Sequence, residues 1–258
     1  MDRRFERDYQ KLAEGLSGWL AGYVRGAGYR KVVIGISGGV DSALSVALAV
    51  RGLGSENVHG LLLPHADSDP ASENDGRLVC EQLGIPFERV EITPYCAPLL
   101  GEVPADEQLR RGNIKARMRM IVLFDYSSKL PALVLGTGNK TEILFGYSTL
   151  HGDDACALNP LANLYKTEVW ELARELGLPE VVIEKSPSAD LWTGQTDEDE
   201  LGISYREADK VLYDMAELRL GEEELIANGH DPARVRHLLD LVRKNAFKRH
   251  LPAVPPKV

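Results

Sequence analysis

Cysteine is scarce in this sequence, and long hydrophobic runs are missing from it. The three cysteines, Cys80, Cys96 and Cys156, are scattered and form no C-x-x-C pair. This pattern argues against a disulfide framework and a zinc site, and it is typical of a reducing compartment. No apolar run approaches the length of a membrane span, and the charged N-terminus does not resemble a signal peptide. We therefore expect a cytoplasmic protein with no membrane partner.

Basic residues are also fewer than acidic residues. The chain has 30 Lys and Arg residues against 39 Asp and Glu residues, which gives a formal net charge of −9. A surface that binds nucleic acid needs a basic stripe to contact the phosphates, so this balance argues against a nucleic-acid partner. The six histidines show no metal-ligand spacing. The rest of the composition is that of an ordinary globular protein.

The most informative segment lies at residues 31–43, Lys-Val-Val-Ile-Gly-Ile-Ser-Gly-Gly-Val-Asp-Ser-Ala. Its β-branched run predicts a strand buried on both faces, and the residues after the glycine pair favour a helix. A helix N-terminus behind a glycine turn directs free backbone N–H groups to one point, which is typical of a phosphate site. Ser37 and Ser42 add hydroxyl groups, and Asp41 adds a carboxylate suited to Mg²⁺. An ordinary strand-to-helix turn is the alternative interpretation.

This turn differs from the two commonest nucleotide-binding motifs. It lacks the Gly-Lys-Ser/Thr ending of a Walker A loop, and it is not a G-x-G-x-x-G fingerprint. Ser-Gly-Gly-Val-Asp-Ser instead resembles the pyrophosphate loop of the N-type ATP pyrophosphatases, which split ATP between its α- and β-phosphates to make an adenylate. The resemblance implies that ATP is the nucleotide.

Helices and strands alternate along the first half of the chain. Strands are predicted over 32–36, 57–63, 87–92 and 132–135. Helices are predicted over 4–27, 41–48, 70–84 and 104–129, with the last one interrupted near Gly112. This alternation predicts an α/β fold with a doubly wound parallel sheet.

The pattern changes from about residue 146. Segments 146–160 and 186–202 look like loops, 166–176 looks like a helix, and helices dominate 205–247. We expect this half to lie over the carboxyl edge of the sheet, where such folds bind ligands.

Further segments after the glycine turn narrow the family. They are Gly-Asn-Ile-Lys-Ala-Arg-Met-Arg-Met at 112–120, Gly-Thr-Gly-Asn-Lys-Thr-Glu at 136–142, Asn-Pro-Leu at 159–161, Tyr-Lys-Thr at 165–167, Ser-Pro-Ser-Ala-Asp-Leu at 186–191 and Asp-Glu-Leu-Gly-Ile-Ser-Tyr at 199–205. Their order and spacing resemble the ammonia-dependent NAD synthetases over about residues 5–253. The resemblance implies one domain over 1–258 with the adenine nucleotide alpha hydrolase-like fold. It implies a pyrophosphatase core at about 30–190 and a helical C-terminal part at about 203–250, packed over the site.

The resemblance also implies an activity. A homodimer would convert deamido-NAD (nicotinic acid adenine dinucleotide), ATP and ammonia to NAD, AMP and pyrophosphate. The nicotinate carboxylate would attack the α-phosphate, and ammonia would open the adenylated intermediate. No side chain is implied as an acid or base, and charge stabilisation falls to Mg²⁺ and Lys166. Only about thirty residues precede the motif strand, so we expect free ammonia or a separate protein, rather than a fused glutaminase domain, to supply nitrogen.

Residues are carried over from the family position by position. The implied ATP contacts are Gly35, Ile36, Ser37, Gly38, Gly39, Val40, Asp41, Ser42, Thr137, Lys166 and Ser188. The implied Mg²⁺ ligands are Asp41, Glu142 and Asp153. The implied deamido-NAD contacts are Arg117 and Lys248.

Each of these assignments has a plainer alternative. Asp41 could complement the helix dipole, and Glu142 could only cap a helix with Asn139. Asp153 lies in a polar turn, and Lys166 by itself suggests a solvated helix residue. Ser188 could cap the turn after a proline. Arg117 could be an ordinary charged residue on the surface, and Lys248 could simply add positive charge at the end of a helix.

The acidic run 197–200 would ordinarily be a solvated face. In the family this segment belongs to a mobile loop that closes over the site, which gives Asp197 and Glu200 a role in excluding water.

The chain departs from the family at three positions of the dinucleotide end. Leu150 stands where many bacterial members have lysine, Ala157 where they have aspartate, and Phe247 where they have histidine. His151 or Asp154 is a hypothetical replacement for the missing polar groups. Two other functions stay open at this point. One is an ATP pyrophosphatase that adenylates another acceptor such as tRNA, and the other is an ATP-binding module without catalysis.

Overall fold

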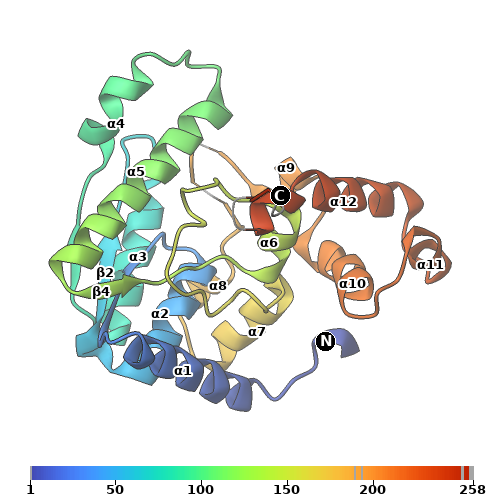
Figure 1. Cartoon of the computed structure of the whole chain (residues 1–258), viewed down its shortest axis with the longest axis horizontal. Coiled ribbons are helices and arrows are strands. Elements are labelled where there is room, and N and C mark those ends of the chain that lie inside the picture. The colour runs from blue at the N-terminus through green and yellow to red at the C-terminus, as the bar shows by residue number, and fades with distance from the viewer. Residues whose placement is uncertain (1, 189, 193, 251–252, 256–258) are drawn as a thin grey trace.

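The structure is a computed structural model that describes residues 2–188, 190–192, 194–250 and 253–255. Within these ranges, four parallel strands form one sheet in the order β3-β2-β1-β4 (Figure 1). The strands are β1 (Lys31–Gly35), β2 (Val58–Leu62), β3 (Phe87–Arg89) and β4 (Ala132–Val134). The strand order reverses between β1 and β4, and ligands of doubly wound sheets bind at such a switch point.

Helices cover both faces of the sheet. One face carries α1 (Tyr9–Gly26), α2 (Val40–Leu53) and α3 (Pro70–Leu83), and the other carries α4 (Thr93–Leu100) and α5 (Gln108–Lys129). β1 explains this arrangement, because its Val32 and Ile34 pack in the core on the α1 face while Val33 packs in the core on the α5 face. Successive side chains of a strand alternate between faces, so a run that is apolar throughout needs cover on both sides.

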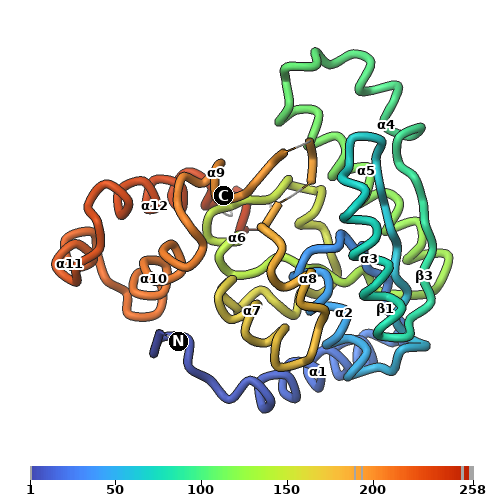
Figure 2. The backbone as a smooth tube through the Cα atoms, turned by 180° about the vertical axis from the view of Figure 1, so that it is seen from behind, coloured from blue at the N-terminus to red at the C-terminus, as the bar shows by residue number. Residues whose placement is uncertain are grey.

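The second half of the chain forms a group of helices beside the sheet. It contains α6 (Lys140–Phe145), α7 (Lys166–Glu175), α8 (Glu180–Ile183), α9 (Asp197–Leu201), α10 (Tyr205–Ala216), α11 (Glu222–Ala227) and α12 (Pro232–Lys244). Short 3₁₀ turns occupy Arg3–Phe5, Ser55–Asn57 and Ala246–Arg249. Figures 1 and 2 both show α6 and α7 between the sheet and α10–α12. A third apolar core joins α2 to α7, α10 and α12.

Most predicted elements are confirmed, but the helices α4, α6 and α8 were not predicted, and other predicted segments differ in detail. The helix expected over 104–129 is not interrupted near Gly112, because α5 runs unbroken from Gln108. Gly112 is needed there for close packing, since a Cβ would lie 2.9 Å from Cδ1 of Leu191. The third strand ends at Arg89, and the segment 186–202 is not all loop because it contains α9. No helix in the described part of the chain is both long and apolar enough to span a bilayer.

Candidate active site

A large cavity opens at the carboxyl end of the sheet. Its volume is about 1400 Å³, and it is lined by the ends of β1, β2 and β4, by α5 and by segments of the second half. This is the edge at which the sequence predicted a ligand site. The cavity is therefore placed where backbone groups of the strand ends and helix N-termini face a ligand.

The predicted phosphate loop lies on the wall of this cavity. Ser37 and Ser42 brace it, with 3.1 Å between their hydroxyl oxygens, and the Ser42 hydroxyl donates to the carbonyl oxygen of Gly39 at 3.0 Å. Gly39 precedes α2, and no side chain caps the helix there. The N–H groups of the first turn of α2 therefore stay available for an anion.

Gly38 shapes the loop without lining the cavity. Its φ is +77°, and a Cβ built on it would lie 2.2 Å from the carbonyl oxygen of Ser72 in α3. Glycine is thus required both for the left-handed backbone and for the close approach of α3. The other predicted loop residues, Gly35–Ser37 and Gly39–Ser42, do line the cavity, as does Thr137 after β4.

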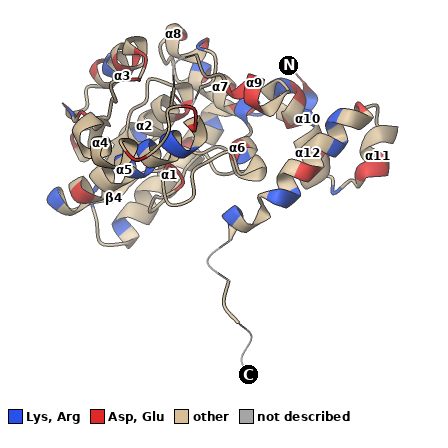
Figure 3. Cartoon of the chain, turned by 90° about the horizontal axis from the view of Figure 1, so that it is seen from above, with Lys and Arg blue, Asp and Glu red and all other residues tan. Residues whose placement is uncertain are grey.

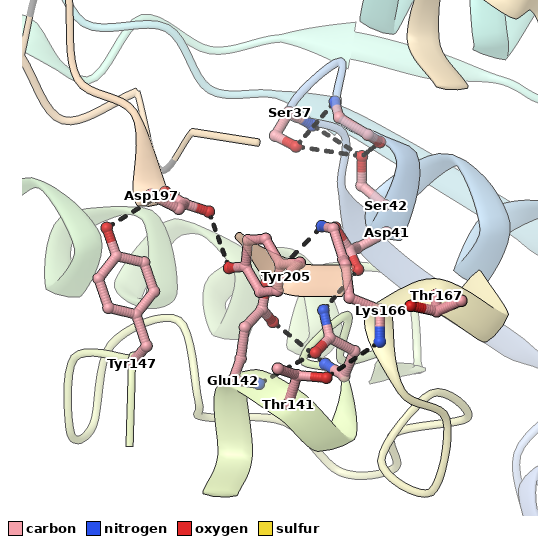
Figure 4. A network of polar contacts seen from close by, with 12 residues as sticks. Ser37, Asp41, Ser42, Thr141, Glu142, Tyr147, Lys166, Thr167, Asp197 and Tyr205 are labelled. Atoms are coloured by element: carbon pink, nitrogen blue, oxygen red, sulfur yellow. Dashed lines mark hydrogen bonds and ion pairs between the residues drawn. The ribbon is translucent and has the colours of Figure 1, made fainter. Parts of the chain in front are cut away.

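Asp41, Glu142 and Lys166 converge on one side of the cavity, although they come from three helices (Figure 4). Lys166 Nζ lies 2.5 Å from Asp41 Oδ2 and 3.9 Å from Glu142 Oε1. Asn139 donates from Nδ2 to the other Asp41 oxygen at 2.8 Å. The predicted metal ligands Asp41 and Glu142 are thus brought together, and Asn139 is a site residue that the sequence analysis treated only as a cap.

The capping interpretation of Glu142 is confirmed, and its second carboxylate oxygen is directed toward Lys166. Its Oε2 accepts a hydrogen bond from the Asn139 N–H at 3.1 Å and completes a capping box, while its Oε1 faces Lys166. Burial and the nearby charge of Asp41 raise the pKa of Glu142 to about 8. The Asp41 charge thus disfavours a second negative charge on Glu142, and a divalent cation bound between the two carboxyl groups would relieve this repulsion.

Lys166 is not a solvated residue. Its side chain is 2% exposed, and its ammonium lies 5.2 Å from the ring centre of Tyr205 and 5.9 Å from that of Trp170. Burial lowers the pKa of Lys166, but the charges of Asp41 and Glu142 outweigh this effect and raise it. The ammonium therefore stays charged beside the phosphate loop.

Asp153, the third predicted metal ligand, does not form one group with Asp41 and Glu142. Asp153 lines the cavity, where its Oδ1 accepts a hydrogen bond from the Thr149 N–H at 2.8 Å. The described residues contain no group of three or more His, Cys, Asp or Glu side chains that could hold a metal ion. The structure thus brings Asp41 and Glu142 together without adding Asp153 to them.

The acidic run in α9 is only partly solvated, because Asp197 is buried at the cavity whereas Asp199 and Glu200 are exposed. Asp197 is 4% exposed, and its carboxylate accepts hydrogen bonds from the hydroxyls of Tyr147 and Tyr205, each at 3.1 Å (Figure 4). Tyr147 also donates to Glu200 at 2.8 Å. Ser188 lines the cavity, and its hydroxyl accepts the Asp190 N–H at 3.1 Å, as expected for a turn. Tyr205 ends the segment 199–205 that carries the resemblance, but no role was assigned to it, and Tyr147 gave no signal in the sequence, because only tertiary packing brings both to Asp197.

The predicted dinucleotide contacts lie farther from this cluster. Lys248 lines the cavity and donates from Nζ to the carbonyl oxygens of Gly146 and Ser148 at 2.7 and 2.8 Å. Arg117 is exposed on α5, and its Nε donates to the carbonyl oxygen of Leu150 at 3.2 Å. Arg117 lies outside the cavity lining of a single chain, as do Leu150 and Phe247.

The remaining positions of the dinucleotide end follow the same pattern. Ala157, His151 and Asp154 are also outside the cavity lining. The structure of one chain therefore gives no support to His151 or Asp154 as replacements for the missing polar groups.

Comparisons with known proteins agree with this geometry. The family model for NAD synthase matches residues 12–252. The chain is 50% identical over 239 residues to the NH(3)-dependent NAD(+) synthetase of Trichlorobacter lovleyi, covering 93% of this chain and 88% of that protein. The NMN synthetase structure from Francisella tularensis has a TM-score of 0.87 at 30% identity and covers 98% of this chain and 100% of its own. The NH3-dependent NAD synthetase structure from Campylobacter jejuni has a TM-score of 0.83 at 33% identity, with 97% and 100% covered.

Proposed function

Because this chain belongs to the NAD synthase family, we propose that it is a ligase that amidates deamido-NAD with ammonia, using ATP and forming NAD, AMP and pyrophosphate. The observation that carries the proposal is the meeting of Asp41, Glu142 and Lys166 beside an uncapped helix N-terminus in one large cavity. This arrangement suits a polyphosphate and the ion that accompanies it.

The reaction has two bond-forming steps. A carboxylate oxygen of deamido-NAD attacks the α-phosphorus of ATP, and pyrophosphate leaves. Ammonia then attacks the acyl carbon, the bond between that carbon and the AMP oxygen breaks, and the proton released from nitrogen passes to solvent. The protein has little acid–base work to do, so positioning and charge stabilisation supply most of the catalysis.

Individual residues have distinct tasks in this proposal. The loop Gly35–Ser42 binds the leaving pyrophosphate with its N–H groups and with the Ser37 and Ser42 hydroxyls. The Lys166 ammonium exchanges Asp41 for phosphate oxygens. Thr137 and Ser188, which both line the cavity, contact ATP. Asp197 and Glu200 hold the covering segment closed through Tyr147, which keeps water from the activated acyl group.

Mg²⁺ fits the two carboxylates that meet near Lys166. Asp41 and Glu142 supply the oxygen ligands that this ion prefers, and Asp153, which also lines the cavity, is the candidate ligand of a second Mg²⁺. When bound, the ion would neutralise phosphate charge and make pyrophosphate a better leaving group.

We also propose that the chain works as a homodimer. β4 is an edge strand, and helices on both faces beside it expose large apolar side chains, namely Trp19 and Tyr23 of α1 and Ile121 and Phe124 of α5. Apolar side chains that are exposed on both helices beside the outermost strand are suited to contact with a second copy. A partner chain at this edge would also give Arg117 a place at the dinucleotide end.

The other partners in the proposal are small molecules, and the compartment is the cytoplasm. Figure 3 shows Lys and Arg interspersed with Asp and Glu along the helices, which is not the pattern of a nucleic-acid surface. The third apolar core, which joins α2 to the C-terminal helices, supports a single domain over 1–258.

The decisive experiment incubates the protein with ATP, Mg²⁺ and deamido-NAD, and follows NAD with an enzymatic assay. One arm contains ammonium and the other contains glutamine. We expect NAD in the ammonium arm only. No NAD in either arm, or pyrophosphate release that RNA stimulates and deamido-NAD does not, would overturn the proposal.

A second candidate substrate is nicotinic acid mononucleotide. The structural similarity to the Francisella tularensis NMN synthetase favours it, as do Leu150, Ala157 and Phe247 at the end that would bind the second nucleotide. This substrate carries the same carboxylate, so the chemistry is unchanged. Measuring kcat/KM for both acceptors under the same conditions decides between them, and we expect the dinucleotide to be preferred.

A further inference from the structure

Asp209 is a completely buried carboxylate in α10 that no part of the proposed mechanism uses. It is 0% exposed. Its Oδ1 accepts a hydrogen bond from the Thr141 hydroxyl at 2.6 Å. Its Oδ2 accepts two more, from the N–H and the hydroxyl of Thr167, each at 2.7 Å. A buried carboxylate is costly unless hydrogen bonds compensate it, and this one is compensated by three.

The groups that bond to Asp209 are direct neighbours of the candidate ligands. Thr141 precedes Glu142 in the first turn of α6, and Thr167 follows Lys166 in the first turn of α7. The Thr141 hydroxyl in addition accepts the Lys166 N–H at 3.0 Å. One carboxylate therefore joins the two helix N-termini that carry Glu142 and Lys166, and Figure 4 shows Thr141 and Thr167 beside those residues.

One further observation indicates that this contact matters for geometry. The opposite end of α6 is also held by the C-terminal part: Lys248 and Arg249 donate to the carbonyl oxygens of Gly146 and Leu144, each at 2.7 Å. The short helix that carries Glu142 is thus fixed at both ends.

We propose that Asp209 is a positioning residue for the ATP and Mg²⁺ site, which sets the directions of Glu142 and Lys166 by holding Thr141 and Thr167. The inference rests on the proposed function, because Asp209 acts through Glu142 and Lys166, which belong to the proposed ATP and Mg²⁺ site. Asp209 contacts no substrate. Hydrogen-bond partners of ligating residues typically change metal affinity or activity by about 10- to 100-fold when they are replaced.

The test compares Asp209→Asn with Asp214→Asn. Both aspartates are buried in α10, but Asp214 pairs with Arg4 and His230 at a distance from the site. Binding of α,β-methylene-ATP with Mg²⁺ is measured by calorimetry, together with the melting temperature and with kcat and KM for ATP. We expect Asp209→Asn to weaken analogue binding and to raise KM for ATP by about 10-fold or more. Asp214→Asn should lower the melting temperature and leave the affinity unchanged.

A second pair of variants covers the case in which Asp209→Asn does not fold. Thr141→Ser keeps the hydroxyl and Thr141→Val removes it, so only Thr141→Val should weaken analogue binding. Wild-type affinity and KM in Asp209→Asn, or equal binding by both Thr141 variants, would overturn the inference. A wild-type protein that binds the analogue but makes no NAD would instead contradict the proposed function, and the binding comparison would still decide the role of Asp209.

Discussion

Lys166 Nζ and Asp41 Oδ2 lie 2.5 Å apart, although 125 residues separate them in the chain. Asn139 holds the other Asp41 oxygen at 2.8 Å, so both oxygens of this carboxylate are directed by neighbours. Contacts within the chain therefore fix the direction of the Asp41 carboxylate before a ligand binds. In the proposed reaction the Lys166 ammonium then leaves Asp41 for phosphate oxygens.

Replacement of Asp41 should remove turnover. Asp41→Ala deletes a candidate Mg²⁺ ligand and leaves the buried Lys166 ammonium without its closest partner. We expect NAD formation to fall by about 10²- to 10³-fold or more, as for other losses of charge stabilisation. Ser45→Ala, one turn further along α2 and outside the cavity, serves as the control. An Asp41→Ala enzyme that keeps most of its rate would refute the metal assignment.

Gly38→Ala should destabilise the loop before α2 more than backbone strain alone would destabilise it. The new Cβ would lie 2.2 Å from the Ser72 carbonyl oxygen, and the alanine would also have to adopt a φ of +77°. Gly84→Ala is the matched control, because Gly84 has a φ of +64° with nothing within 4 Å. Left-handed backbone alone costs about 1–2 kcal/mol. We expect the Gly84 variant to lose about that much stability and to bind ATP normally, while Gly38→Ala loses more stability and also ATP binding. Equal effects of the two changes would contradict the close-approach argument.

The ion pair between Arg4 and Asp214 should make stability depend on pH in the acid range. Burial raises the pKa of Asp214, but hydrogen bonds and charges from Arg4 and His230 outweigh burial and lower it below its usual 3.8. A lowered folded pKa gives stability that is present above about pH 4 and is lost as the pH falls through the folded pKa.

Asp214→Asn should therefore be less stable than the wild type by about 1–3 kcal/mol at pH 7. The difference should shrink below about pH 4, where the wild-type carboxyl group takes up its proton. Urea unfolding at pH 7, 5 and 3 measures it. A difference that stays constant over this range would argue against the ion pair.

Ile121→Glu should separate the proposed homodimer. Ile121 is 53% exposed on α5 beside the β4 edge, and a charge there would have to be buried at the interface. Val181→Glu is the control, because Val181 is 55% exposed on α8, away from that edge. Light scattering should give a dimer for the wild type and the control and a monomer for Ile121→Glu. A wild-type monomer would contradict the proposal.

The elements that local chemistry governs could be predicted well from the sequence. The strand, glycine turn and helix at 31–43 depend on backbone preferences within a few residues, and β1 and α2 confirm them. The capping spacing of Asn139 and Glu142 is equally local, and the structure contains that cap. The site residues were assigned by resemblance to a family whose motif order the chain retains, and of these the structure brings Asp41, Glu142 and Lys166 together.

Packing and burial that depend on residues far apart in the sequence could not be predicted in this way. Gly112 looked like a helix break, but α5 continues through it, and Leu191, 79 positions later, packs against the space that a side chain would fill there. Lys166 looked solvated on its own, and its burial depends on Asp41 from α2 and on Tyr205 from α10.

The sequence by itself thus determined that a glycine turn joins β1 to α2, because glycine freedom and helix ends act over one or two turns. Only the tertiary structure decided which carboxylates face that loop and which side chains hold them there, as Asp209 does for the first turns of α6 and α7. The reason is physical: the charge state and direction of a buried group are set by partners that the chain brings together only when the helices pack.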